Sequence, residues 1–153
     1  MTEIVAVDAL KDHIGKQRAP SEWMVVDQER VQAFADATLD HQFIHLDEEK
    51  AKQTPFGGTI VHGYLTLSLL PHFTAQCGIA PEGTVMAINY GSDKLRFLQP
   101  VPVGSSVRAH MVLNEVTEKG PGQFLFKSTV TVEIKDQDKP ALICEALSMF
   151  VVR

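Results

Sequence analysis

An aspartate and a histidine five residues apart, Asp40 and His45, are the side chains in this sequence best suited to acid–base chemistry. Residues 39–44 have no regular hydrophobic period, which predicts a loop that can turn both side chains into one cavity. A carboxylate beside an imidazole can orient the ring or polarise a water, and the imidazole titrates near neutral pH. Taken alone, such a pair is equally typical of helix caps and of the protein surface.

A second candidate lies eighteen residues beyond His45, where His62 is followed by Gly63. The pattern places Gly63 at the start of a buried helix, where its backbone N–H would point along the positive end of the helix dipole. Such an N–H is a suitable donor to a carbonyl oxygen that gains negative charge during a reaction. The structural alternative is that Gly63 only allows the helix to approach a strand closely.

These residues need helices to position them. Residues 60–77 form the most apolar segment, and apolar side chains all around it predict a helix buried on more than one face. Pro71 predicts a kink or break within it. Upstream, we expect a helix at 5–14, a strand at 21–26, a helix after Asp27 as its N-cap, and a short helix at 47–52.

After Gly83 the hydrophobic pattern changes to that of strands. Apolar side chains alternate from Phe124 to Ile134, which is the period of a strand with one buried face. The expected strands are residues 84–89, 94–98, 106–118, 123–135 and 140–152. Helices followed by antiparallel strands indicate an α+β class, with the sheet curled around the buried helix.

Composition limits the kind of protein. The 153 residues suit one domain, spanning residues 1–153, and 44% hydrophobic with 22% charged residues is typical of a soluble globular chain. A net charge of -5 argues against a nucleic-acid binder. We expect no signal peptide and no membrane span, hence a cytoplasmic protein whose two cysteines are free thiols.

Three segments together resemble a known family. They are LDHQFIH at residues 39–45, FGGTIVHG at 56–63, and DKLRFLQPV at 93–101 followed by Gly104. In this order they resemble the MaoC-like hydratases, the (R)-specific enoyl-CoA hydratases of the hotdog fold, from about Val25 onward. The family's usual Gly before the Asp is Leu39 here, and its Asn-Pro is Gln42-Phe43. This variation resembles the subgroup described as nodulation-protein-N-like.

The departures have physical consequences. Gln42 keeps a side-chain amide but adds a methylene, which alters the support it can give the loop. Loss of the proline removes a rigid turn. Because both Asp40 and His45 keep their spacing, these departures bear on substrate range more than on chemistry.

The resemblance implies a long central helix wrapped by an antiparallel sheet. It also implies reversible addition of water to a trans-2-enoyl-CoA, which gives an (R)-3-hydroxyacyl-CoA. Asp40 and His45 would hold the water, Gly63 would bind the thioester oxygen through its N–H, and Gln42 and His62 would support them. No metal or redox cofactor is implied, since coenzyme A enters with the substrate. Hotdog relatives join two sheets edge to edge, so we expect a homodimer with its site near the interface.

Three alternatives remain at the level of sequence. His41 and His45, with Asp40, Glu48, Glu49 and His62 nearby, could bind zinc, although Phe43 and Ile44 make a poor metal loop. A hotdog thioesterase would share the acyl-CoA ligand. The third is a non-catalytic acyl-CoA-binding module.

Overall fold

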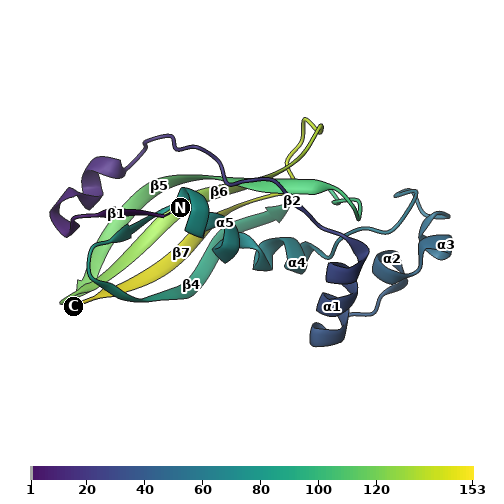
Figure 1. Cartoon of the computed structure of the whole chain (residues 1–153), viewed down its shortest axis with the longest axis horizontal. Helices are drawn as coiled ribbons and strands as arrows, with labels where there is room; N and C mark the ends of the chain where they lie inside the picture. Colours follow the sequence, from purple (N-terminus) through teal and green to yellow (C-terminus); the bar gives the residue numbers. More distant parts are fainter. Residues whose placement is uncertain (1) are drawn as a thin grey trace.

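The structure is a computed structural model that describes residues 2–153, and an antiparallel sheet of five strands dominates it (Figure 1). The strand order is β2-β5-β6-β7-β4, and each neighbouring pair is antiparallel. The strands are β2 (Met24–Val25), β4 (Thr84–Phe97), β5 (Ser106–Gly120), β6 (Gln123–Ile134) and β7 (Leu142–Val152). One edge strand, β2, has only two residues, whereas the other, β4, has fourteen.

The core lies on the concave face of this sheet. Every second residue of β6 from Phe124 to Ile134 is buried, which confirms the predicted alternation. Phe73 from the helical layer and Val107, Val130 and Leu142 from the sheet are fully or almost fully buried in this core. Both cysteines are free and buried, as expected from the sequence.

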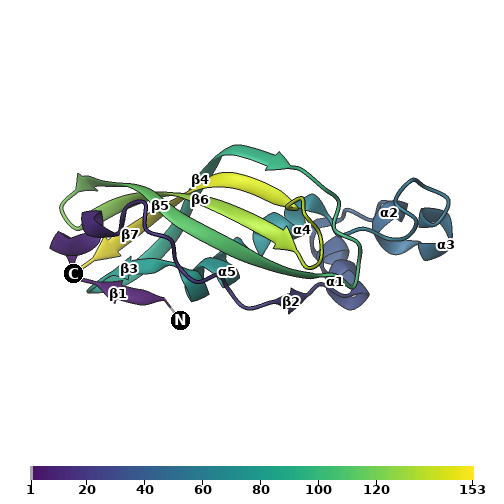
Figure 2. The same ribbon diagram turned by 90° about the horizontal axis from the view of Figure 1, so that it is seen from above.

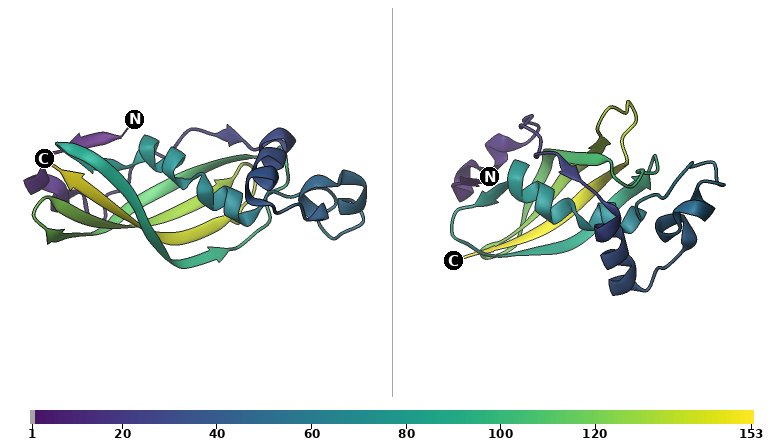
Figure 3. Two further views of the ribbon diagram at one scale, coloured as in Figure 1. Left: turned by 90° about the horizontal axis from the view of Figure 1, so that it is seen from below. Right: turned by 45° about the vertical axis from the view of Figure 1, so that its right-hand side comes forward.

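Two short helices lie along the concave face, α4 (Gly63–Ser68) and α5 (Leu70–Cys77) (Figure 3). They replace the single helix predicted for residues 60–77 and meet at Leu69. Pro71 lies in the first turn of α5, where the missing N–H of a proline costs no intrahelical hydrogen bond. The predicted break is therefore present, two residues before the proline.

Three further helices gather at one end of the sheet (Figure 2). Helix α1 (Gln28–Thr38) begins after Asp27, whose carboxylate accepts a hydrogen bond from the Arg30 N–H at 2.9 Å, which confirms the predicted N-cap. Helix α3 (Glu48–Ala51) confirms the expected short helix. The predicted loop at 39–44 is wrong at its end, because Phe43–Leu46 form the helical turn α2.

The N-terminal segment differs from the prediction. A helix was expected over residues 5–14, and a helix is present, but it is a 3-10 helix limited to Val7–His13 and is preceded by strand β1 (Glu3–Val5). Strand β1 pairs in parallel with β3 (Ile79–Pro81), which follows α5. The apolar residues Val5 and Leu10 pack against Phe124 and Phe126, so tertiary contacts stabilise this segment.

Strand β4 corrects a further expectation. The sequence predicted two strands, 84–89 and 94–98, separated by polar residues, yet the chain stays extended throughout β4. Its pairing with β7 shifts register at three places, and Lys94 takes a left-handed conformation with φ 50°. These bulges absorb Gly91 and the polar residues without ending the strand. None of the helices in residues 2–153 is long and apolar enough to cross a membrane.

Candidate active site

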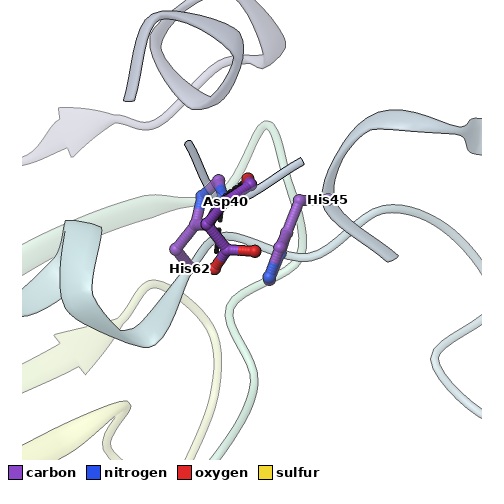
Figure 4. Close-up of side chains that lie close together, drawn as sticks. All are labelled: Asp40, His45 and His62. Atoms are coloured by element: carbon purple, nitrogen blue, oxygen red, sulfur yellow. Dashed lines mark hydrogen bonds and ion pairs between the residues drawn. The ribbon is translucent and has the colours of Figure 1, made fainter. Parts of the chain in front are cut away.

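Asp40, His45 and His62 converge at the end of the sheet where α1, α2 and α4 meet (Figure 4). One nitrogen or oxygen atom of each lies within 4.8 Å of those of the other two. Asp40 lies in the loop after α1, His45 lies in α2, and His62 directly precedes α4. The structure therefore brings together the two motifs that the sequence separates by seventeen residues.

His45 is held in one orientation by a backbone carbonyl. Its Nδ1 lies 2.6 Å from the Ile60 carbonyl oxygen, and the side chain is 6% exposed. Because a carbonyl oxygen only accepts, Nδ1 carries the proton, and Nε2 is the unprotonated nitrogen of the neutral ring. Burial lowers the pKa of His45 from its usual 6.5, and the nearby His62 acts in the same direction, against the Ile60 carbonyl and Asp40. His45 is therefore a neutral proton acceptor at neutral pH.

His62 fixes the loop that carries Asp40. Its Nε2 donates to the Asp40 backbone carbonyl at 3.0 Å, and its ring stacks on the His45 ring with centroids 3.8 Å apart. The ring centroid of Phe34, in α1, lies 5.0 Å from that of His62. His62 is 2% exposed, and its Nδ1 has no hydrogen-bond partner among residues 2–153. His62 thus packs between Asp40 and His45 on one side and helix α1 on the other.

Asp40 is more open to solvent, with its side chain 53% exposed. Its carboxylate lies 4.0 Å from His62 Nε2 and accepts a hydrogen bond from the Gln42 N–H at 3.4 Å. Gln42 was expected to support the loop through its amide, but the contact comes from its backbone. A water with two hydrogen bonds of about 2.8 Å spans about 4.5 Å. The spacing of the cluster therefore fits one water shared by Asp40 and His45.

A set of polar contacts that sequence reasoning missed joins α1 and α2 to the segment before α4. The Gln28 amide donates to the His45 carbonyl at 2.7 Å, and its oxygen accepts from the Thr59 hydroxyl at 2.9 Å. Ile60 N–H donates to the Ile44 carbonyl at 2.9 Å. These contacts hold both sides of the His45–Ile60 hydrogen bond, so they set the position of the ring.

Glu48 completes this support from α3. Its carboxylate accepts a hydrogen bond from the Thr59 N–H at 3.1 Å and shares the one Thr59 hydroxyl proton with the Gln28 amide oxygen, and these bonds lower the pKa of Glu48. A Cβ at Gly58 would lie 3.3 Å from the same carboxylate. No local pattern in the sequence could identify Thr59 as the partner of Glu48.

A cavity of about 370 Å³ opens beside His45. Gly63 and Thr66 of α4, with Phe97 at the end of β4, line it and its wall is mostly apolar. As the first residue of α4, Gly63 has an N–H without an acceptor inside the helix. A Cβ there would lie 3.1 Å from the Phe97 ring. The surroundings of Gly63 therefore support both interpretations, an N–H that is free to donate and a helix that approaches a strand closely.

The same three side chains could supply ligands to a metal ion, since their donor atoms lie close together. The stacking of the two histidine rings works against this. His45 Nδ1 and His62 Nε2 donate to backbone carbonyls, which leaves only His45 Nε2 and His62 Nδ1 with lone pairs, and the two rings stack with only 26° between their planes. In-plane lone pairs of stacked rings run nearly side by side and do not converge on one point. His41, the other histidine of the zinc alternative, pairs instead with Asp36 at 2.8 Å.

Comparison with known proteins places this geometry in a family. The MaoC-like domain family matches residues 9–136. The chain is 45% identical over 137 residues to 3-hydroxyacyl-thioester dehydratase Z of Mycobacterium tuberculosis, covering 90% of each protein. It is 45% identical over 145 residues to nodulation protein N of Rhizobium leguminosarum, covering 93% of this chain and 88% of that protein.

A solved structure gives the same result for the fold. The (R)-hydratase from A. caviae involved in PHA biosynthesis superposes with a TM-score of 0.71 and 28% identity, over 86% of this chain and 92% of that one. The curled sheet around two central helices is thus the hotdog arrangement that the sequence predicted. The chain belongs to the MaoC-like dehydratase family.

Proposed function

We propose that the protein is an (R)-specific enoyl-CoA hydratase, which adds water reversibly to a trans-2-enoyl-CoA to give an (R)-3-hydroxyacyl-CoA. The observation that carries the proposal is that an oxygen of the Asp40 carboxylate and a nitrogen of the His45 ring lie within 4.8 Å of each other, close enough to bind one water together. An apolar cavity lined by His45 and Gly63 adjoins it. Membership of a dehydratase family supports the same chemistry, because hydration and dehydration are one reaction in two directions.

The neutral state of His45 supports a role as the proton acceptor. Its Nε2 accepts a proton as the water oxygen bonds to C3, and the π electrons of C2–C3 move into the thioester as an enolate. The pair then delivers a proton to C2, which completes the addition of H and OH. The buried ring and its bond to Ile60 keep the accepting nitrogen in place.

Gly63 N–H stabilises the enolate oxygen in this scheme. One such donor is worth about 3 kcal/mol in a water-poor site. Because the alkene of the substrate is already polarised by its thioester, the reaction needs no metal or redox cofactor. Coenzyme A takes part only as the carrier of the acyl group.

The decisive experiment measures hydration of crotonyl-CoA by loss of absorbance of the enoyl thioester. Asp40→Asn and His45→Gln keep the shapes of the side chains but remove their proton transfer, so each lowers kcat by about a hundredfold or more. His41→Gln is the matched control, since His41 is exposed and pairs only with Asp36. Near wild-type rates in both site variants would refute the proposal.

The products separate this function from its alternatives. Chiral analysis must give the (R)-3-hydroxyacyl-CoA. Release of free thiol from an acyl-CoA would indicate a thioesterase instead, and binding of acyl-CoA without turnover would indicate a non-catalytic module.

We also propose that the protein is a homodimer joined along β4. This strand pairs only with β7, so its other edge is free among the described residues. Large apolar side chains along it are about half exposed, namely Val85, Met86, Ile88 and Tyr90. A long, unpaired, apolar edge supports pairing with a second copy around a twofold axis.

A further inference from the structure

One side chain connects the two chain segments that hold the His45 ring. The ring is carried by α2, whereas the carbonyl that accepts its Nδ1 proton belongs to Ile60, fifteen residues further on. A hydrogen bond between two separate segments keeps its geometry only if something fixes those segments relative to each other. Gln28, the first residue of α1, contacts both of them. The Gln28 side chain therefore bears on the orientation of the His45 ring.

The amide of Gln28 uses both of its ends. Its Nε2 donates to the His45 backbone carbonyl at 2.7 Å, and its Oε1 accepts from the Thr59 hydroxyl at 2.9 Å. Because a carbonyl oxygen can only accept, the nitrogen of the amide must face His45 and the oxygen must face Thr59. One planar group thus holds the residue that carries the ring against the residue that precedes Ile60.

Both partners of this amide belong to buried residues. His45 and Thr59 are each 6% exposed, although Gln28 itself is exposed. The Thr59 N–H donates to the Glu48 carboxylate at 3.1 Å, and the Thr59 carbonyl accepts from the Val103 N–H at 3.0 Å. Thr59 is therefore fixed to α3 and to the segment before β5. Through Gln28, His45 is tied to this fixed point.

Helix α1 contacts the second histidine of the site as well. The ring centroid of Phe34, six residues after Gln28, lies 5.0 Å from that of His62. The His62 ring in turn stacks on the His45 ring at 3.8 Å. Helix α1 therefore reaches both rings, one through an aromatic contact and the other through the backbone that carries it.

Building on the proposed function, we propose that Gln28 is a positioning residue for proton transfer by His45. Its amide keeps Nδ1 of His45 on the Ile60 carbonyl, and so keeps the unprotonated Nε2 directed at the water that attacks C3. Such an acceptor must be held within about 0.5 Å of its productive position. Gln28 does not line the cavity beside His45, so it acts through the placement and the tautomer of the ring.

Gln28→Glu tests this proposal with little change in shape. The carboxylate can accept from the Thr59 hydroxyl, but it repels the His45 carbonyl instead of donating to it. We expect kcat for crotonyl-CoA hydration to fall by about tenfold and KM to change by less than about twofold, because the cavity keeps its lining. Gln32→Glu is the matched control. It adds the same charge one turn further along α1, where the amide bonds Asp36, and should keep the wild-type kcat.

The tautomer of His45 gives a readout that does not depend on turnover. Above neutral pH, the ring-nitrogen NMR shifts of the wild type should show a protonated Nδ1 and an unprotonated Nε2, and Gln32→Glu should show the same. In Gln28→Glu the two shifts should move toward each other, because a ring without a fixed bond to Ile60 exchanges between its tautomers. The resonances are assigned by their absence from His45→Gln.

Thr59→Val tests the path by which Gln28 acts. It removes the hydroxyl that holds the Gln28 oxygen while keeping the shape of the side chain. We expect a fall in kcat similar to that of Gln28→Glu. The double variant should be no slower than the slower single variant, because residues that act through one connected set of hydrogen bonds are not additive.

An unchanged kcat in Gln28→Glu would overturn the inference, and so would a lower kcat with the His45 tautomer intact. A double variant whose loss is the product of the two single losses would overturn the path through Thr59. If Gln28→Glu does not fold, Gln28→Ala removes the same donor without adding a charge and should show both changes. Failure of the wild type to hydrate crotonyl-CoA refutes the proposed function instead, whereas the NMR comparison still decides whether Gln28 positions the ring.

Discussion

The hydrogen bond from His45 to the Ile60 carbonyl decides the chemistry that this ring can perform. It places the proton on Nδ1, and burial opposes a second proton on Nε2. Asp40, in contrast, remains half exposed. The two candidate catalytic groups therefore differ in environment, and such differences separate the proton-transfer roles of neighbouring groups.

The pH dependence of activity and stability follows from His45. Because its folded pKa lies below 6.5, kcat/KM for crotonyl-CoA should stay level down to pH 6.5 and fall only below it. The unfolded state binds the proton more readily, so the free energy of unfolding should also decrease as the pH falls below 6.5. Denaturation at several pH values should show a shallower decrease for His45→Gln. An activity loss that begins above pH 7 would contradict this assignment.

Gly63→Ala tests whether the glycine is needed for its lack of a side chain, because the substitution leaves the backbone N–H in place. The substitution keeps the N–H but presses a Cβ against the Phe97 ring, at 3.1 Å before relaxation. Displacement of the helix start should lower kcat/KM by about tenfold to a hundredfold. Adding Phe97→Ala removes the obstacle, so the double variant should regain the activity of Phe97→Ala alone. If Gly63→Ala had the wild-type rate, the close approach of Gly63 to the Phe97 ring would not be what positions the N–H.

Residue types and spacing made Asp40, His45 and His62 candidates, because each belongs to a short motif, and the structure places the three side chains together. The same approach could not find Gln28, Thr59 and Glu48. Gln28 and Thr59 are thirty-one residues apart, and their hydrogen bond exists only once α1 and the segment before α4 are packed together. A glutamine in a first helical turn and a glutamate in another have no local feature that reveals such a partner.

At the scale of elements, the patterns that depend on nearby residues predicted the correct structures. The alternation in β6 and the N-cap of α1 were predicted, since both depend on local chemistry. The 3-10 form of the helix Val7–His13, the strand β1 before it and the continuous β4 were not, because neighbouring strands and core contacts determine them. Leu39 shows a local conflict that the protein tolerates. It ends α1 in the left-handed conformation with φ 63°, where the family usually has glycine.

Leu39→Gly should therefore stabilise the protein. A left-handed conformation costs a non-glycine residue about 1–2 kcal/mol, and Leu39 is 81% exposed, so little packing is lost. After the extra chain entropy of glycine, we expect a gain of about 0.5–1 kcal/mol in the free energy of unfolding. Glu29→Gly, at an exposed helical position of α1, is the matched control and should destabilise by about 1 kcal/mol. Denaturant titration measures both, and destabilisation by Leu39→Gly would refute the conformational argument.

At the scale of the whole molecule, the two edges of the sheet are unequal. The edge at β2 is two residues long, whereas β4 presents fourteen residues that pair on one side only. The sequence predicted open edges and hence a dimer, but it could not say which edge would pair, since strand order depends on long-range contacts.

The assembly can be tested at this edge. The wild type should have twice the chain mass of 16.9 kDa by light scattering at micromolar concentration. Met86 and Ile88 lie two residues apart on β4 and share one face, so Met86→Lys/Ile88→Lys places four new positive charges around the twofold axis and should give monomers. Val25→Lys charges an equally exposed apolar position on β2 and should leave the dimer intact. A monomeric wild type, or a dimer that only the Val25 variant dissociates, would show that β4 is not the interface.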